Sequence, residues 1–348
     1  MNSHSRFGQQ KPSRFLLFSF VSASCIIDGI TMLQKGIFTI SIDYESAWGY
    51  ADHDLSNTDK ERIRGEAAIT RRLIELFEKY NVPATWAIVG HLFERGCTWD
   101  NDTPHPEYPR PIHKDEKRDW FAEHPPKNEY TDPLWFDVDN LVSDIARSPV
   151  GHELASHGYA HIMYGEDTTN REAVMADLAN LGRVNRIHDV PFTSFVFPRN
   201  IEGYHRMIKV NGFTAYRGVS PKWNDRHTGS KRRLTNLLDY YLPSAVTFVP
   251  KVTIHGLINI PDSMLLLGRN GPRKLILPSV MVRKAKKGLK KAARRKEVFH
   301  LWFHPSNFSY DTETQFRIFE KILARAGTLR DKGMLDIKTL NAIGTTNV

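Results

Sequence analysis

Cysteine is scarce in this chain of 348 residues, which holds two copies, Cys25 and Cys97. Two cysteines cannot form a disulfide framework, and neither has a second cysteine at the spacing of a metal-binding pair. The sequence therefore excludes a disulfide-built secreted scaffold. A reducing compartment is the simplest expectation, and we predict a cytoplasmic protein, free or peripheral to a membrane, rather than a secreted one.

Long apolar runs are lacking as well, since a membrane-spanning helix needs about 20 apolar residues. The run over residues 15–27 (FLLFSFVSASCII) is too short for that. It resembles the core of a secretory signal, or it belongs to an upstream extension with the true start at Met32. We expect residues 1–33 to be a disordered, signal-like or untranslated extension, and residues 34–345 to form the folded domain.

Acidic residues are missing from residues 263–296. The net charge is +9, and Arg283–Lys296 (RKAKKGLKKAARRK) alone carries nine Lys and Arg. Such a run is commonly a solvated helix face. With Ala285, Leu289 and Ala292 on one side, it could instead lie on an anionic membrane surface, or bind the phosphate groups of a ligand. Nucleic acid is not expected, because no aromatic residues are interleaved and no nucleic-acid motif accompanies the run.

The rest of the chain has an ordinary composition, with 41% hydrophobic and 25% charged residues. Gly36–Ile42 is apolar and β-branched and ends at two acidic residues, which is typical of a buried strand. Arg62–Tyr80 has apolar residues at helical spacing, and Val82–Val89 is a second strand. This order of strand, helix and strand predicts a parallel α/β sheet.

The alternation continues toward the C-terminus, with two interruptions. The stretch 97–133, with its seven prolines, and the basic, irregular stretch 221–297 are expected to be insertions. Seven or so strand–helix units fit a closed parallel barrel or an open doubly wound sheet, and both place functional groups at the carboxyl ends of strands. We predict further helices over 136–147, 171–186, 204–211 and 312–332, and further strands ending at 156 and over 193–197, 214–216 and 298–303.

Polar residues with metal-binding chemistry stand at three of the predicted strand ends. His157 and His161 are four residues apart, so on a helical turn they share one face and can share one metal ion. Asp43 and Glu45 supply one carboxylate for that ion and one for a base. A surface histidine pair and an exposed acidic strand end are the alternatives. His152 is five residues from His157, off any shared helical face, and receives no role.

A third signal is His304, which ends the otherwise apolar strand 298–303. A histidine at such a position needs a polar partner if it is buried. The alternative is a core histidine whose ring is satisfied by the surrounding structure. Alone, none of these signals identifies a function.

Together, the signals resemble the polysaccharide deacetylase family, the carbohydrate esterases with a nodulation-type deacetylase homology domain. SIDYE at 41–45 is similar to the Asp-x-Asp/Glu form of the family's first motif, and ELASHGYAH at 153–161 matches its His-Ser/Gly-x-x-His motif. ATWAIVG at 84–90, FVFPRN at 195–200 and LWFH at 301–304 correspond to the remaining motifs. The motifs occur in the family's order.

The resemblance implies a distorted, partly open (β/α)7-8 barrel and a metal-dependent hydrolase. Its substrate would be an N-acetylated sugar of a surface polysaccharide such as lipopolysaccharide, or the lipid- or nucleotide-linked precursor of one. The acetyl group would be removed at a linear C–N amide bond. The roles carried over are Asp43 as base, His304 as acid, Arg199 as the residue that tunes the base, and Glu45, His157 and His161 as ligands of Zn²⁺ or another divalent metal.

Several alternatives stay open. Asp43 and Glu45 could exchange roles, and the Arg of the third motif follows its proline instead of preceding it. The branch with the Asp-x-Glu motif includes hydrolases of cyclic amides and imides that are not sugars. A basic membrane- or nucleic-acid-binding protein with a non-catalytic deacetylase fold is the competing class, and the oligomeric state is not predicted. The aromatic residues expected to stack on a sugar, with core packing as their alternative, are Tyr44, Trp48, Trp86, Tyr164, Trp223 and Trp302.

Overall fold

The computed structural model describes residues 33–345 except 52–53, 113–118, 123–131, 168, 222–234, 236–237 and 243–244. The expected N-terminal extension lies outside the described residues, apart from its last residue, and so does Trp223. No helix among the described residues is long and apolar enough to cross a membrane.

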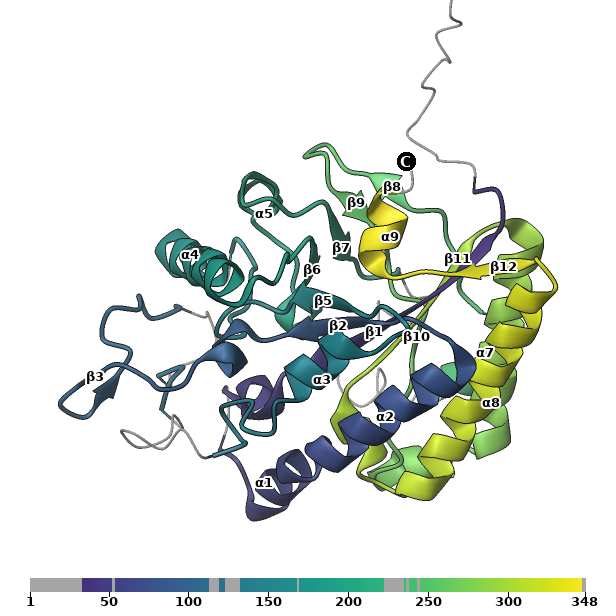
Figure 1. The fold of residues 1–348 in the computed structure, drawn as a ribbon, viewed down its shortest axis with the longest axis horizontal. Helices are drawn as coiled ribbons and strands as arrows, with labels where there is room; N and C mark the ends of the chain where they lie inside the picture. Colours follow the sequence, from purple (N-terminus) through teal and green to yellow (C-terminus); the bar gives the residue numbers. More distant parts are fainter. Residues whose placement is uncertain are drawn as a thin grey trace, which may run out of the picture.

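A curled, open sheet of ten strands forms the centre of the molecule (Figure 1). Its strands run in the order β10-β11-β1-β2-β5-β6-β7-β9-β8, with β12 beside the start of β1, and all pairs are parallel except β8 with β9. Strands β3 and β4 form a separate antiparallel hairpin. The bounds are β1 (Gly36–Tyr44), β2 (Thr85–Ile88), β3 (Trp99–Asp100), β4 (Thr103–Pro104), β5 (Glu153–Ser156), β6 (Ser194–Val196), β7 (Ala215–Arg217), β8 (Lys251–Val252), β9 (Ile258–Asn259), β10 (Met264–Leu265), β11 (Val298–Phe303) and β12 (Leu335–Ile337).

This order decides between the two architectures that the sequence left open. From β1 to β9 the main-sheet strands follow one another around the sheet in chain order, and β11 returns to pair with β1. A doubly wound sheet would instead reverse its direction partway. The fold is therefore the predicted distorted (β/α) barrel, left open between its edge strands β8 and β10.

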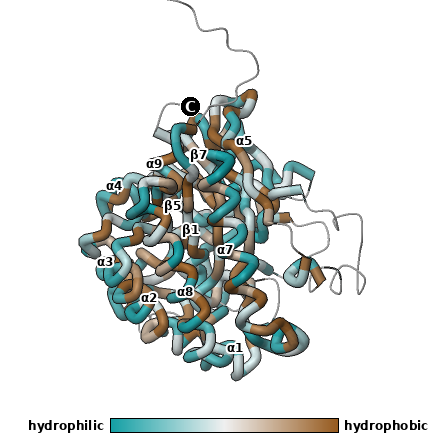
Figure 2. Tube along the Cα trace, turned by 90° about the vertical axis from the view of Figure 1, so that its right-hand side faces the viewer, coloured by the Kyte–Doolittle hydropathy of each residue, from teal (hydrophilic) through white to brown (hydrophobic). Residues whose placement is uncertain are grey.

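The α-helices with the bounds given below surround the sheet. Hydrophilic and hydrophobic residues alternate along them (Figure 2), as expected of helices that bury one side. Helices α2, α7 and α8 pack side by side against its outer face. The bounds are α1 (Asn57–Arg64), α2 (Glu66–Tyr80), α3 (Leu141–Arg147), α4 (Arg171–His188), α5 (His205–Val210), α7 (Pro278–Arg295), α8 (Thr312–Asp331) and α9 (Leu340–Thr345).

Local sequence explains where these helices begin and end. The predicted helix over 62–80 is divided at Gly65 into α1 and α2. Ser56 and Asp59 form a capping box at the start of α1, and Asn81 ends α2 in the left-handed conformation, with a φ of 49°. Its buried Phe77 then packs against Trp86 of β2, with ring centroids 6.2 Å apart.

The expectation of an irregular stretch over 221–297 is wrong for its second half. Pro278 occupies the first turn of α7, which runs for 18 residues to Arg295. The helix lies tightly on β11, because a Cβ at Gly288 would stand 2.3 Å from the Phe299 ring. Ala285, Leu289 and Ala292, the side that would meet a membrane in one of the three interpretations, are fully buried in the core. A surface partner would therefore meet only the charged side of α7.

Candidate metal-binding active site

The strand register gathers the predicted site residues at one end of the sheet. Asp43 near the end of β1 pairs with Ala87 of β2, and Ile88 of β2 pairs with Ser156 of β5, which directly precedes His157. On the other side of β1, Ile42 pairs with Phe303, which directly precedes His304. Carboxyl ends of parallel strands therefore bring residues from distant parts of the chain together, as the sequence predicted.

Glu45 and the two histidines form a compact donor set. Glu45 Oε2 lies 3.3 Å from His157 Nε2 and 3.0 Å from His161 Nε2, and donor atoms of all three residues lie within 4.8 Å of one another. Both imidazoles are buried. Oxygen and nitrogen ligands at about 2.0–2.2 Å from a tetrahedral metal ion are spaced about 3.3 Å apart, close to these distances.

The hydrogen bonding of the two imidazoles also fits a metal ion. His157 Nδ1 lies 2.8 Å from the carbonyl oxygen of Val196, so that nitrogen donates and leaves the Nε2 lone pair for a ligand bond. Nδ1 of the buried His161 makes no hydrogen bond with the part of the chain that the structure describes, and its Nε2 faces Glu45 Oε2 at 3.0 Å. A buried imidazole in this state is expected where an ion completes the site.

The histidine pair does not lie on a helix, contrary to the sequence prediction. Residues 157–165 form an irregular segment after β5, with positive φ values of 74° at Gly158 and 56° at His161. The rings nevertheless meet, with centroids 4.8 Å apart. The spacing of four residues is thus produced by a loop.

A buried carboxylate that the sequence analysis missed holds this loop. Asp177 of α4 accepts hydrogen bonds from the backbone N–H groups of Tyr159 and Ala160, at 2.7 and 2.9 Å. The hydroxyl groups of Tyr108 and Tyr164 donate to it as well, each at 2.7 Å. Asp177 lies among the apolar residues on the buried side of α4. An acidic residue at such a position is the sequence signal that could have identified it.

Asp43 is paired with Arg217 at the end of β7, instead of with Arg199. Arg217 Nη1 donates to Asp43 Oδ1 at 2.5 Å and Nη2 to Oδ2 at 2.7 Å, and both residues are buried. Arg199 instead donates to the carbonyl oxygen of Gly49 at 2.9 Å. Arg217, and not Arg199 as expected, therefore contacts Asp43 directly. The sequence around Arg217 holds no local signal for this role.

Glu45 depends on the turn that Arg199 contacts. Glu45 precedes the short 3-10 helix Ser46–Tyr50, and its carboxylate lies beside the Cα of Gly49. A Cβ at Gly49 would stand 2.1 Å from Glu45 Oε1, so only glycine leaves room for the carboxylate in this position. Arg199 therefore fixes a turn that supports a candidate ligand.

His304 completes the group of predicted residues. Its Nε2 lies 3.4 Å from Glu45 Oε1 and 3.7 Å from Asp43 Oδ2. The side chain is 25% exposed, against 3% for Asp43, so it is the more accessible of the two to a substrate. His304 thus faces both carboxylates from the open side.

Charges within the site set the protonation states that metal binding requires. Burial raises the pKa of Asp43, but the charge of Arg217, with smaller effects of His157 and His304, outweighs it and holds the pKa below its usual value. Burial likewise opposes ionisation of Glu45, yet His304 and His161 hold its pKa well below the ordinary range. Burial lowers the pKa of His161. Ionised carboxylates and neutral imidazoles are the ligand forms.

Most of the aromatic residues expected to bind sugar are interior residues. Trp48, Trp86 and Tyr164 have no exposed surface, and Tyr44 has 4%. Trp48 packs in a cluster with Trp135 and His91, and the Tyr164 hydroxyl bonds to Asp177. The stacking prediction is therefore wrong for these four. Trp302 is 8% exposed and lies beside His304, with ring centroids 5.7 Å apart.

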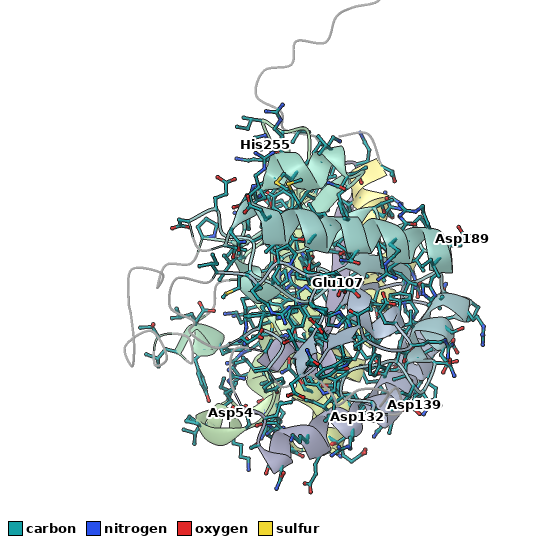
Figure 3. All side chains as sticks on the ribbon, turned by 90° about the vertical axis from the view of Figure 1, so that its left-hand side faces the viewer. Asp54, Glu107, Asp132, Asp139, Asp189 and His255 are labelled. Atoms are coloured by element: carbon teal, nitrogen blue, oxygen red, sulfur yellow. The ribbon has the colours of Figure 1, made fainter. Side chains whose placement is uncertain are left out.

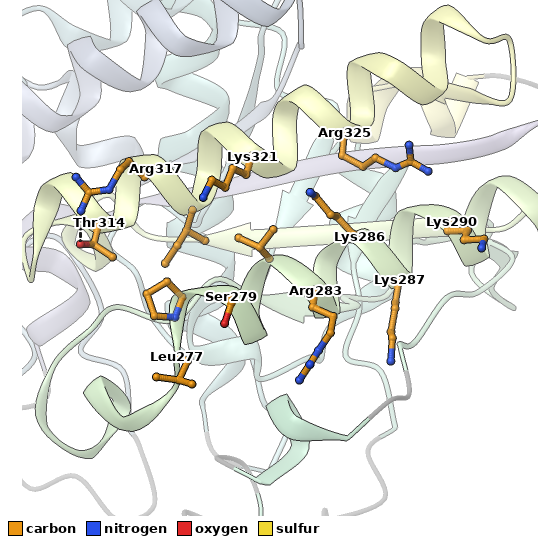
Figure 4. Close-up of a pocket in the computed structure, with 13 residues that line it drawn as sticks. Leu277, Ser279, Arg283, Lys286, Lys287, Lys290, Thr314, Arg317, Lys321 and Arg325 are labelled. Carbon is orange, nitrogen blue, oxygen red and sulfur yellow. Dashed lines mark hydrogen bonds between the residues drawn. The ribbon is translucent and has the colours of Figure 1, made fainter.

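A basic groove lies away from this site, between α7 and α8 (Figure 4). It has a volume of about 1100 Å³, and none of its lining residues among the described part of the chain is acidic. Its apolar lining residues include Val282 and Ile318. The cations along it are Arg283, Lys286, Lys287 and Lys290 from α7 and Arg317, Lys321 and Arg325 from α8.

Comparison with known proteins supports the fold of this chain, and it does not identify a substrate or an activity. No protein-family model matches the chain, and no curated protein matches it in sequence. A polysaccharide deacetylase candidate from Mycobacterium smegmatis matches in structure with a TM-score of 0.57 and 13% identity, over 91% of this chain and 92% of that one. A polysaccharide deacetylase candidate from Pseudomonas aeruginosa PAO1 matches with a TM-score of 0.52 and 11% identity, over 88% and 89%.

A third similar structure is of a different named activity. The Puue allantoinase matches with a TM-score of 0.53 and 9% identity, over 88% of each chain. At these identities the likeness concerns the fold. The chain therefore has the fold of the polysaccharide deacetylases, as its motifs predicted.

Proposed function

We propose that the protein is a metal-dependent deacetylase that hydrolyses the acetamido C–N bond of an N-acetylated sugar. The observation that carries the proposal is the donor set of Glu45, His157 and His161 beside a separate, ionised Asp43. These three residues would hold Zn²⁺ or another divalent ion. Such an ion, when bound, polarises the carbonyl oxygen and makes water more acidic.

The remaining residues divide the proton transfers between them. Asp43 takes a proton from the attacking water as its oxygen bonds to the acetyl carbon, and Arg217 keeps this carboxylate ionised and oriented. His304 in its protonated form donates to the sugar nitrogen as the C–N bond breaks, because an amide anion is too poor a leaving group. Acetate and the free amine are the products. General acid–base help of this type typically contributes about 10²–10⁴-fold per group.

The test separates binding of the ion from chemistry. Asp43→Asn is expected to keep the metal and lose about 10²–10⁴-fold in acetate release from N-acetylglucosamine oligomers, whereas Glu45→Gln loses the metal as well. Asp139→Asn on the exposed surface is the matched control. Near-normal turnover of Asp43→Asn, or a folded wild type that retains no divalent ion from metal-containing buffer, would refute the assignment.

A second candidate function follows from the allantoinase among the similar structures. The same donor set and base could open a cyclic amide or imide, in which the leaving nitrogen stays attached to the product. Allantoin and N-acetylglucosamine oligomers assayed on one metal-loaded preparation distinguish the two. Turnover of the cyclic amide with no acetate release would move the proposal to this second class.

We also propose that the groove between α7 and α8 binds phosphate groups of an anionic partner, as a lipid headgroup or as part of a linked sugar precursor. Seven cations with no acid among the lining residues support it. Lys286→Ala with Lys290→Ala should weaken sedimentation with phosphatidylglycerol vesicles, or binding of a nucleoside-diphosphate sugar, several-fold. Lys332→Ala, at the end of α8, is the control. Tight duplex DNA binding in place of both would contradict this assignment.

A further inference from the structure

A second set of metal-binding side chains lies outside the site described above. His91 follows β2 in the short 3-10 helix Gly90–Phe93, Cys97 precedes the β3–β4 hairpin, and His105 follows it. His91 Nε2 lies 3.1 Å from His105 Nε2 and 3.4 Å from Cys97 Sγ. Donor atoms of all three lie within 4.8 Å of one another, so one ion can contact all three.

We propose that His91, Cys97 and His105 form a second metal site, which binds Zn²⁺. Zinc bonds to imidazole nitrogen at about 2.0–2.1 Å and to thiolate at about 2.3 Å, and a tetrahedral arrangement then spaces these donors about 3.3–3.6 Å apart. The spacings in the structure agree with this within a few tenths of an ångström. The mixture of one sulfur and two nitrogens selects zinc over magnesium or calcium, which prefer oxygen.

The surroundings of the three side chains match those of zinc ligands. The other ring nitrogen of His105, Nδ1, lies 3.4 Å from a carboxylate oxygen of Glu107, and a carboxylate in that place fixes the ring so that Nε2 faces the ion. Figure 3 looks onto this side of the molecule, with Glu107 labelled. His91 and His105 are buried and Cys97 is half-buried, so the three donor atoms are largely shielded from solvent.

The position of the site suggests that it fixes the insertion onto the catalytic end of the sheet. The backbone N–H of His91 donates to the carbonyl oxygen of Tyr159, between the two candidate ligands His157 and His161. The His91 ring packs on Trp48, three residues after Glu45, with centroids 4.5 Å apart. An ion held by His91, Cys97 and His105 would therefore tie the β3–β4 hairpin to both halves of the first site. No ligand is shared between the two sites.

The two sites can be measured separately because one of them contains sulfur. Metal analysis of the full chain purified with zinc is expected to give about two ions per chain, falling to about one in Cys97→Ala and in His105→Gln. Loading with Co²⁺ alone should produce a thiolate-to-cobalt charge-transfer band in the near ultraviolet. That band should vanish in Cys97→Ala and persist in Glu45→Gln, which removes a ligand of the other site only.

Two controls keep the outcome decisive. Cys25→Ala should retain the band, which assigns it to Cys97, and circular dichroism should show that Cys97→Ala and His105→Gln remain folded. A wild type with no thiolate-to-cobalt band, or a band that survives in folded Cys97→Ala, would overturn the proposal and leave a hydrogen-bonded cluster. Loss of the band in Glu45→Gln would also overturn it, because the sites would not be separate.

Discussion

Arg217 of β7 and Asp43 of β1 form a bidentate ion pair, although the two residues are 174 positions apart in the chain. The guanidinium is held from other sides as well. Its Nη1 donates to Ser41 Oγ at 3.1 Å and its Nη2 to Asn200 Oδ1 at 3.0 Å. Its central carbon lies 4.4 Å from the centroid of the Trp302 ring. Four elements thus determine the orientation of the candidate base through Arg217. They are β1, β7, β11 and the short 3-10 helix that ends at Asn200.

Shortening this side chain should therefore impair chemistry more than binding. In Arg217→Lys the charge remains, but an ammonium cannot make both bonds to Asp43. A displacement of about 1 Å can cost about 10²-fold in rate, so kcat should fall by this order while the metal content and KM change little. Steady-state kinetics with metal analysis tests it, and Arg206→Lys on the exposed side of α5 is the control. Unchanged kcat would contradict a positioning role.

Removing the positive charge of Arg217 should also lower the free energy of unfolding. In Arg217→Met the buried Asp43 carboxylate loses its partner, and breaking a buried ion pair from one side typically costs about 3–5 kcal/mol. Urea unfolding of the metal-free protein measures it. The double variant Arg217→Met with Asp43→Leu should recover much of this loss, because it removes both charges. Failure to recover would show that the packing of Arg217, rather than its charge, is what matters.

Asp177→Asn is expected to loosen the loop that carries both histidine ligands. An amide offers one acceptor oxygen where the carboxylate offers two, so at least one of the four donors loses its partner. Each buried donor left unsatisfied costs about 1–3 kcal/mol. Unfolding in urea should show this loss, and zinc affinity should fall with it. Asp189→Asn, exposed at the end of the same helix, should change neither.

Gly49→Ala should act on the metal site with little effect on the rest of the fold. The added Cβ would occupy the position of Glu45 Oε1, and the carboxylate, as the end of a flexible side chain, would have to move away from the histidines. We expect a loss of metal affinity of at least tenfold, about 1.4 kcal/mol, by competition with a chelator. Gly327→Ala in α8, where a Cβ meets nothing closer than 3.7 Å, is the matched control. Equal affinity in both variants would contradict the prediction.

The sequence predicted those parts of the site that carry a local signal. Asp43 and His304 were found because they interrupt apolar strands near their ends, and His157 and His161 because their spacing is a known motif. Arg217 could not be found in this way. It ends the short strand β7, and only the register of β7 with β6 and β9 brings it to Asp43.

The errors in the fold have equally physical origins. The basic run was interpreted as a helix with a solvated or membrane-facing side, because its many cations conceal a narrow apolar side that packs on the sheet at Gly288. Aromatic residues near strand ends, such as Trp48 and Trp86, were assigned to a sugar-binding surface, although large rings gain most free energy when buried. Burial depends on what the chain places over a residue, and the insertion over 97–133 covers Trp48 through Phe121.

His152, which received no role in chemistry, has a structural role with a measurable pH dependence. Its Nδ1 accepts a hydrogen bond from the backbone N–H of Ala84 at 3.0 Å, and its ring packs against Phe77 and Trp86. Burial lowers its pKa from 6.5 to about 4, because a charged ring would lose its hydration there. Nδ1 would also have to give up its role as an acceptor on protonation.

The folded protein therefore binds fewer protons at His152 than the unfolded chain between pH 4 and 6.5. Stability from this group is complete above about pH 6.5 and is lost as the pH falls toward 4, by at most about 3 kcal/mol. In His152→Asn the amide oxygen can accept from Ala84 but cannot be protonated in this range. Urea unfolding between pH 4 and 7 should thus show a smaller acid loss in this variant than in the wild type, and His188→Asn on the surface should match the wild type. Equal acid losses in His152→Asn and wild type would mean that the ring is protonated in the folded state without penalty.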